Sequence, residues 1–182
     1  MNVTRDEVLE VIPEFELISD DELREKAIGI WAEQLSIYGW KASDLEEIPF
    51  TTLIKDNPVS LAIHMRTLAK QCDVCVDLIN KDYGDTLKIN KDVLIAGALL
   101  HDIGKIGGTE KSENSFRESQ REKLLHHSFS GVGILMSAGI MDEVVHAVAL
   151  HSRDGEGRRA TPEAVLLHHI DFMNYEALKL HK

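Results

Sequence analysis

The sequence predicts an all-α protein on two observations. The first is the helical spacing of apolar residues, clearest in one stripe: Leu61, Met65, Leu68, Val76 and Ile79. The second is the recurrence of helix-start signals, in which a small polar residue precedes a glutamate or a proline. With 182 residues, 43% of them hydrophobic, the chain is long enough for one domain with a buried core.

Residues 1–57 are predicted to form a helical extension that packs on this core. Capping-box patterns at residues 4–7 and 19–22 precede a short helix that Pro13 ends and a longer helix that Gly39 ends. A connector over residues 40–56 follows. Three aromatic residues are expected to anchor the extension on the main body or at a homodimer contact: Trp31, Trp40 and Phe50.

The main domain is predicted to cover residues 58–182. The Asn-Pro pair at 57–58 supplies a cap followed by a proline and begins a helix over residues 59–80. Asp92 can cap the apolar segment 93–101. Periodicity alone leaves this segment open between a helix and a buried strand.

The second half of this domain is predicted to contain a polar loop and three helices. The loop covers residues 104–120 beside the candidate site, where it could act as a mobile lid. Helices are expected over residues 121–138 and 141–152, followed by a loop with glycines and arginines. The Thr-Pro pair at 161–162 begins the last helix.

Composition excludes several classes of function. The formal net charge is −11 and the pI is near 5.2, which oppose a broad basic groove for long nucleic acid. No segment approaches the ~20 apolar residues of a membrane span, and the acidic N-terminal residues do not resemble a signal peptide. A cytoplasmic protein that acts on a small molecule is therefore expected.

Cys72 and Cys75 form a C-x-x-C pattern on a predicted helix. A zinc site would need a second such pair, and a thioredoxin-like site would need a preceding strand. The sequence indicates neither, so both side chains are expected in the core.

Polar residues interrupt the most apolar segments in a pattern that suggests a metal site. Six of them stand in or at the ends of these segments: His64, His101, Asp102, His127, His151 and Asp171. Taken singly, His64 could be a hydrogen-bonded core residue, and a buried Asp171 would need a cation to face it. Together, imidazole and carboxylate groups suit a transition metal, which can activate water at an open position.

The order of these residues resembles that of the HD superfamily of metal-dependent phosphohydrolases, an all-helical fold named for its His-Asp pair. Residues 101–105 read HDIGK, and His127 begins an H-x-x-x-G segment followed by Ile-Leu at 134–135. The stretch 151–155 is similar to one that normally begins with two histidines, and 161–178 resembles the final helix of the exonuclease-like branch. The resemblance implies an HD-domain helical bundle with an N-terminal helical extension.

The resemblance also implies one or two divalent ions of the Fe, Mn, Ni, Co or Zn type. The first ion would be held by four residues: His64, His101, Asp102 and Asp171. Asp102 would bridge to a second ion held by His127 and His151, and a metal-activated water would attack phosphorus. Asp102 and Lys105 would be the catalytic residues, and the Lys105 ammonium would bind a phosphate oxygen of the substrate. Alternatively, Lys105 only complements a helix dipole.

Two departures limit what the resemblance implies. Ser152 replaces the second histidine of the usual His-His pair, so a third metal ion is not implied. The GYP signature of one branch is absent, because residues 155–159 read GEGRR instead. This difference argues against the cyclic-dinucleotide turnover of that branch.

Several basic and histidine side chains are expected near these ligands, and two interpretations are open for the arginines. Three arginines of the loop before the last helix could bind substrate phosphates or could be solvent-facing charge: Arg153, Arg158 and Arg159. His126 is expected on the solvent side of His127, and His168 is expected behind the ligands as a hydrogen-bonding partner. Arg66 points elsewhere on its helix and receives no role.

These inferences predict a metal-dependent phosphohydrolase that cleaves a phosphate mono- or diester, in a nucleotide or a short oligonucleotide. A nucleotide-binding regulatory HD module with little or no turnover is the alternative. An exonuclease acting on single-stranded ends is a third interpretation, which the net charge disfavours.

Overall fold

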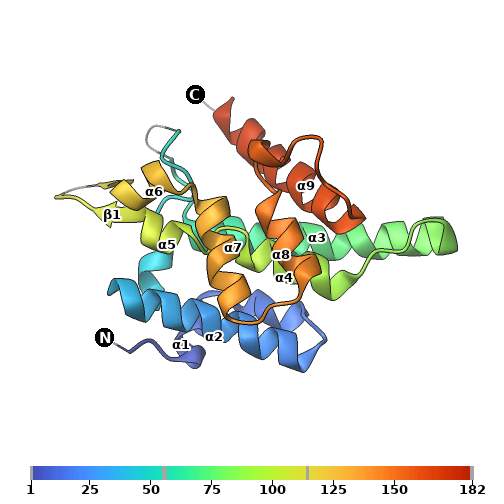
Figure 1. Ribbon diagram of the computed structural model, residues 1–182, viewed down its shortest axis with the longest axis horizontal. Helices are drawn as coiled ribbons and strands as arrows, with labels where there is room; N and C mark the ends of the chain where they lie inside the picture. The colour runs from blue at the N-terminus through green and yellow to red at the C-terminus, as the bar shows by residue number, and fades with distance from the viewer. Residues whose placement is uncertain (1, 55–56, 114, 181–182) are drawn as a thin grey trace.

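The computed structural model describes residues 2–54, 57–113 and 115–180, and its fold is all-α, as predicted (Figure 1). In chain order the elements are α1 (Arg5–Val11), η1 (Pro13–Leu17), α2 (Asp21–Tyr38), η2 (Ala42–Glu46), α3 (Leu61–Tyr83), η3 (Gly84–Thr86), α4 (Lys91–Leu100), α5 (Lys105–Gly108), β1 (Thr109–Lys111), β2 (Phe116–Glu118), α6 (Gln120–Leu124), α7 (His127–Ser137), α8 (Asp142–Ala149), η4 (Arg153–Gly155) and α9 (Pro162–Lys179). Within these described stretches, no helix is long and apolar enough to span a bilayer.

Helix α4 is the central element of the bundle (Figure 1). It packs against α3, α8 and α9 and also contacts α2, and its residues from Val93 to Leu100 are all buried. A helix that is apolar on every side is stable only when other elements surround it. The segment that periodicity left open between helix and strand is therefore a helix, and it delivers the buried His101 to the interior.

The N-terminal extension packs on the bundle through its predicted aromatic anchors. Trp31 Nε1 donates a hydrogen bond to the Leu99 carbonyl (2.8 Å), and Trp40 Nε1 donates one to the Ile106 carbonyl (3.1 Å). Phe50 is also buried. The extension and the bundle share one apolar core, whereas the predicted domain boundary stays a prediction.

Three predicted helix boundaries are confirmed. Thr4 and Glu7 form the capping box of α1, and the Thr161 side chain caps α9. Gly39 ends α2 with a φ of 74°, a left-handed conformation in which a residue with a Cβ would be strained.

Three predicted caps were wrong, and one carboxylate is involved in two of the errors. Asp20 rather than Ser19 caps α2, and Asn90 rather than Asp92 caps α4. The Asp92 carboxylate instead accepts hydrogen bonds from the backbone N–H groups of Ser19 (2.7 Å) and Asp20 (3.1 Å). It joins the starts of two helices that are remote in sequence, so local patterns could not indicate it.

The helix predicted from residue 59 begins later than expected, with Ser60 rather than Asn57 as its cap. The residues before it are extended and pair with the connector, because the Phe50 N–H donates to the Val59 carbonyl (3.2 Å). This pairing keeps Phe50 beside the first turn of α3.

The polar segment 104–120 contains more regular structure than predicted. It begins with α5 and continues into the β1–β2 hairpin, in which Thr109 pairs with Glu118. Its role as a mobile lid stays a prediction.

The helix predicted over residues 121–138 is in fact two helices, because α6 ends at Leu124 and α7 begins at His127. The following helix also ends early, at Ala149. Because of these breaks, His127 is the first residue of α7 and His151 lies just beyond α8. Each ring can therefore turn toward the bundle interior.

The two cysteines of the C-x-x-C pattern lie on α3, and both are free thiols. Cys72 is fully buried, and Cys75 is half-buried against the core. Burial raises the pKa of the Cys72 thiol, so it stays protonated, in agreement with the predicted core position.

Candidate metal centre

The structure brings all six predicted ligands together at one end of the buried helix α4. They come from five places in the fold: His64 from α3, His101 and Asp102 from the end of α4, His127 from the start of α7, His151 from the chain after α8, and Asp171 from α9. Because these elements are separated in sequence, only their packing around α4 assembles the cluster.

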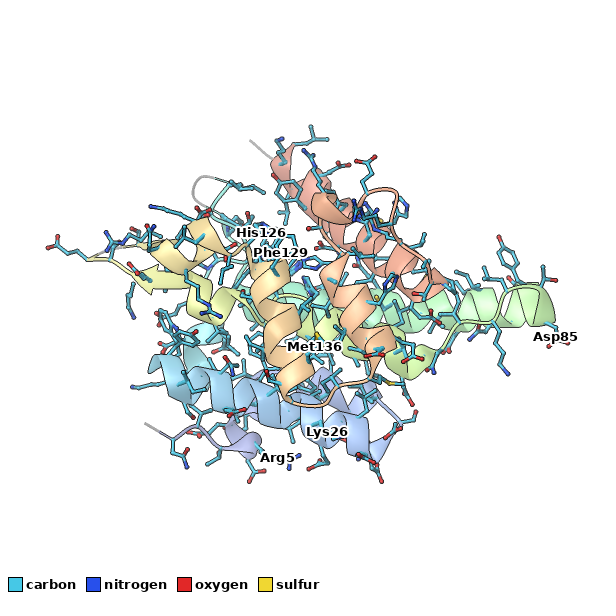
Figure 2. All side chains as sticks on the ribbon, viewed as in Figure 1. Arg5, Lys26, Asp85, His126, Phe129 and Met136 are labelled. Carbon is cyan, nitrogen blue, oxygen red and sulfur yellow. The ribbon has the colours of Figure 1, made fainter. Side chains whose placement is uncertain are left out.

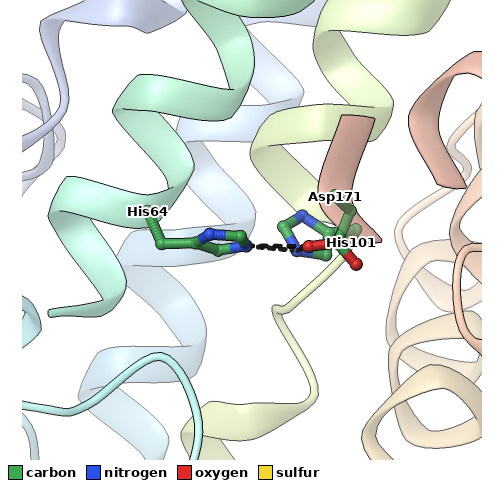
Figure 3. A group of neighbouring side chains, drawn as sticks. All are labelled: His64, His101 and Asp171. Atoms are coloured by element: carbon green, nitrogen blue, oxygen red, sulfur yellow. Dashed lines mark hydrogen bonds and ion pairs between the residues drawn. The ribbon is translucent and has the colours of Figure 1, made fainter. Parts of the chain in front are cut away.

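Three of these residues form a first group, drawn in Figure 3. The His64 ring points at Asp171, with 3.2 Å between Nε2 and Oδ1, and its Nε2 also lies 3.2 Å from His101 Nε2. On its far side, His101 Nδ1 lies 2.8 Å from the Ala98 carbonyl oxygen, to which an N–H group there would donate. This bond leaves Nε2 of His101 free to face the cluster.

Asp102 lies at the middle of the cluster and is 1% exposed. Its Oδ2 lies 3.2 Å from His101 Nε2 and accepts a hydrogen bond from Lys105 Nζ (2.7 Å). Its Oδ1 faces the other way, 3.5 Å from His127 Nε2 and 4.0 Å from His151 Nε2. The two oxygens of one carboxylate thus face two different sets of imidazoles.

His127 and His151 both face Asp102 Oδ1 and are treated together as the second group, although His151 also lies within ligating reach of His101. Each ring is held from behind. His151 Nδ1 lies 2.6 Å from the Val148 carbonyl oxygen. His127 Nδ1 lies 2.9 Å from Glu122 Oε1, which also accepts the His127 backbone N–H (3.1 Å). Both rings therefore present Nε2 to Asp102.

Sequence reasoning did not find Glu122. It lies five residues before His127, on α6, and the chain breaks between the two helices, so helical spacing could not relate them. A glutamate that closely precedes a predicted histidine ligand was the available signal.

Burial keeps three of the histidines in the neutral form that binds metals. It lowers the pKa of His64 and of His127 below the ordinary value. It lowers the pKa of His151 to about 3, with the charge of His101 acting in the same direction.

The two aspartates stay ionised although burial opposes their charge. Against that opposition, the charges of His101 and Lys105 hold the pKa of Asp102 well below its ordinary value. The hydrogen bond from His64 and the charge of His101 likewise lower the pKa of Asp171 to about 2. Burial lowers the pKa of His101, but the charge of Asp102 outweighs it and the net change is upward.

These groups fit a divalent transition metal. Asp102 Oδ1 is a fully buried carboxylate oxygen that has no hydrogen-bond partner among the described residues. Such an atom is costly to bury unless a cation or a donor satisfies it. With neutral imidazole nitrogens converging on the same carboxylate, the donor set is of the mixed N/O kind that Fe, Mn, Co, Ni and Zn accept.

A cavity of about 390 Å³ opens above the cluster. Its floor consists of Lys105 and four of the six candidate ligands: Asp102, His127, His151 and Asp171. Its sides are largely apolar and come from two separate segments, the connector and α9, through Phe50, Leu53, Phe172 and Tyr175.

The three loop arginines differ in position. Arg153 lines the cavity, whereas Arg158 is exposed and is not among its lining residues. Arg159 donates to the carbonyls of Leu150 (2.8 Å) and Ser152 (2.7 Å), so its contacts hold the loop. Substrate binding by these arginines stays a prediction.

Three further polar residues lie beside the cluster: His126, His168 and Ser152. The His126 side chain is 43% exposed, whereas that of its neighbour His127 is 13% exposed, as expected of a residue on the solvent side of His127. His168 Nδ1 lies 2.6 Å from the carbonyl oxygen of His151, so it does lie behind the ligands. Ser152 stands where the family that the sequence resembles usually has a second histidine. Its hydroxyl accepts a hydrogen bond from Ser128 (3.2 Å).

The profile of the HD domain matches residues 60–174, and the chain belongs to this family. Its His-Asp pair is the one at the end of α4 around which the cluster is built.

The chain is also 28% identical, over 167 residues, to a protein of Methanocaldococcus jannaschii named dihydroneopterin 2',3'-cyclic phosphate phosphodiesterase. The similarity covers 86% of this chain but only 64% of the relative, so the chain spans less than two thirds of that protein's length. No solved structure matches the chain. Family and relative together support a metal-dependent phosphohydrolase in general terms.

Proposed function

We propose that this protein is a metal-dependent phosphohydrolase that cleaves a small phosphodiester. One observation carries the proposal: the two oxygens of the buried Asp102 face separate groups of imidazoles, and Oδ1 lacks a hydrogen-bond partner among the described residues. A carboxylate in this position is suited to bridge two cations.

The proposed ligands divide along the two sides of Asp102. One ion would be held by His64, His101 and Asp171, and the other by His127 and His151, with Asp102 shared. When bound, divalent ions lower the pKa of a coordinated water and neutralise charge that develops on a phosphate. Three of the histidines are oriented in advance for this coordination, because carbonyls tie His101 and His151 at Nδ1 and Glu122 ties His127.

Lys105 is proposed to bind the substrate phosphate. Its ammonium lies at the cavity floor, where it contacts Asp102 Oδ2 and donates to the Phe50 carbonyl. A cation at this point would lie beside a phosphate placed over the centre and stabilise charge that gathers on its oxygens. Replacing Lys105 with alanine should lower kcat roughly 100-fold, with little change in metal content.

The choice of a small diester over a monoester or a polymer rests on three supports. The relative's name describes the cleavage of a cyclic phosphodiester of a small molecule. The cavity of about 390 Å³ is at the small end of ligand sites. The net charge of −11 disfavours a long polyanion.

The test combines metal analysis with a substrate panel. Metal-depleted protein is reconstituted separately with Mn, Fe, Co, Ni and Zn and assayed on 2',3'-cyclic nucleotides, linear diesters and monoesters. The expected result is metal-dependent hydrolysis of diesters that Asp102→Ala abolishes. Nucleotide binding without turnover in every metal form would favour the regulatory HD module instead.

A further inference from the structure

The cavity has an aromatic wall that the proposed hydrolysis does not require. Phe172 and Tyr175 follow Asp171 on α9 and line the cavity, with ring centroids 6.0 Å apart in an edge-to-face arrangement. The guanidinium of Arg153 lies over the Phe172 ring, 5.7 Å from its centroid. Phe172 also packs on the His168 ring, with 4.4 Å between the centroids, but phosphate binding by itself does not require aromatic groups at the cavity wall.

The other apolar side of the cavity comes from the connector. Leu53, which is 74% exposed, and the buried Phe50 line the same cavity. In Figure 1 the connector (teal) and α9 (red) stand apart on the same side of the bundle. Apolar groups of two separate segments therefore border one opening whose floor is polar.

This arrangement matches the shape and chemistry of a planar ring. Aromatic edges and a guanidinium plane are groups against which a flat heteroaromatic system can stack. An exposed leucine can cover another part of such a ring at the cavity mouth. The cavity volume of about 390 Å³ has room for one ring system and a phosphate, but not for a chain of nucleotides.

We infer that Phe172, Tyr175 and Arg153 form a subsite for a planar heteroaromatic ring. The substrate is then a small phosphodiester whose alcohol carries one such ring, as in a nucleoside. The inference rests on the proposed function for the position of the phosphate, which lies over the metal ligands at the cavity floor. It gives Arg153 a role in ring stacking rather than in binding a second phosphate.

The test compares two cyclic phosphodiesters: adenosine 2',3'-cyclic phosphate, which carries a heteroaromatic base, and glycerol 1,2-cyclic phosphate, which carries neither a base nor a sugar ring. With metal-reconstituted protein, Phe172→Ala should raise KM for the adenosine ester about tenfold, in keeping with the loss of one stacking contact. Its kinetics on the glycerol ester should change less than about twofold. Met173→Ala is the matched control, since Met173 is exposed on the same helix outside the cavity lining.

Turnover of the glycerol ester also reports whether each variant keeps an intact centre. If Phe172→Ala loses both activities, Phe172→Leu keeps most of the volume without the ring and repeats the comparison. Equal effects on the two esters in Phe172→Leu and in Tyr175→Ala would overturn the subsite and leave the proposed hydrolysis standing.

Binding of adenosine, which has no phosphate, separates the two proposals. Calorimetry on metal-depleted protein should detect adenosine binding that Phe172→Ala weakens about tenfold. If no phosphate ester is hydrolysed but this binding is observed, the proposed function fails and the subsite is supported. If adenosine does not bind and the native protein treats both esters alike, the subsite is refuted.

Discussion

The two halves of the candidate centre are built differently. In the first group, His64, His101 and Asp171 already contact one another, with distances of 3.2 Å between His64 Nε2 and each of its two partners. In the second group, His127 and His151 stand 3.5 and 4.0 Å from Asp102 Oδ1 and are held from behind.

The difference shows how each half achieves its geometry. The first group is organised mainly by direct contacts among its members, with the Ala98 carbonyl behind His101 as an added support, so the loss of one member disturbs the others. The second group depends on outside supports, the Val148 carbonyl and Glu122, that orient separate rings. The second half should therefore be the weaker metal site and the more sensitive to changes outside the ligand set.

The largest expected effect is that of Asp102→Ala, because this carboxylate belongs to both halves. Hydrolysis should fall at least 1,000-fold, as is typical for the loss of a shared catalytic group, and the content of both metals should drop. Elemental analysis and turnover measure the two effects. Asp85→Asn, at the far end of α3 (Figure 2), is the control and should leave both unchanged. If Asp102→Ala retained two ions, Asp102 would not be shared by the two halves of the centre.

Single histidine substitutions should separate the halves. His127→Ala should remove one ion and leave the first-group ion bound, because its ring contacts only the Oδ1 side of Asp102. His64→Ala should lower metal content at least as much, since its ring contacts both other members of its group. His169→Ala, an exposed histidine on α9, is the control. An unchanged metal count in His127→Ala would mean that the protein uses one ion.

Glu122→Gln tests the outside support of the second half. Losing the carboxylate behind His127 should weaken the second metal about 10–100-fold, the usual effect of removing such a partner, while the first metal is retained. Stepwise metal titration by calorimetry measures both affinities. Glu118→Gln on the neighbouring hairpin is the control. Equal weakening of both metals by Glu122→Gln would mean that the two halves are not independently organised.

The last expected effect concerns folding rather than metal binding: the pH dependence of stability without metal. Burial lowers the pKa of His151 from 6.5 to about 3, so the unfolded chain binds this proton more readily than the folded one. Stability contributed by neutral His151 is full above pH 6.5 and is lost as pH falls toward 3, by at most about 1.4 kcal/mol per pH unit.

Urea unfolding of metal-depleted protein at pH 7, 6, 5 and 4 measures this slope. His151→Gln has no such proton to bind, so its stability should fall less steeply between pH 6.5 and 4. Identical slopes in the two proteins would place the acid sensitivity elsewhere.

Local sequence was sufficient for the helical class and for much of the site. The capping box at Thr4 and the Thr161 cap act within a few residues, so they were readable from the chain. The six candidate ligands were found because charged or imidazole groups are rare inside apolar segments. Their chemistry alone indicated a metal of the transition series.

Tertiary structure decided what depended on residues remote in sequence. The apolar run of α4 is a helix because other helices surround it. The Asp92 side chain does not cap its own helix but bonds with the residues that precede α2. Glu122 can lie behind the His127 ring only because α6 ends before α7 begins and the chain changes direction between them. The division of the ligands between the two oxygens of Asp102 likewise arises from packing. Sequence records which groups are present, whereas distance and direction between them are set by the burial of α4 among its neighbours.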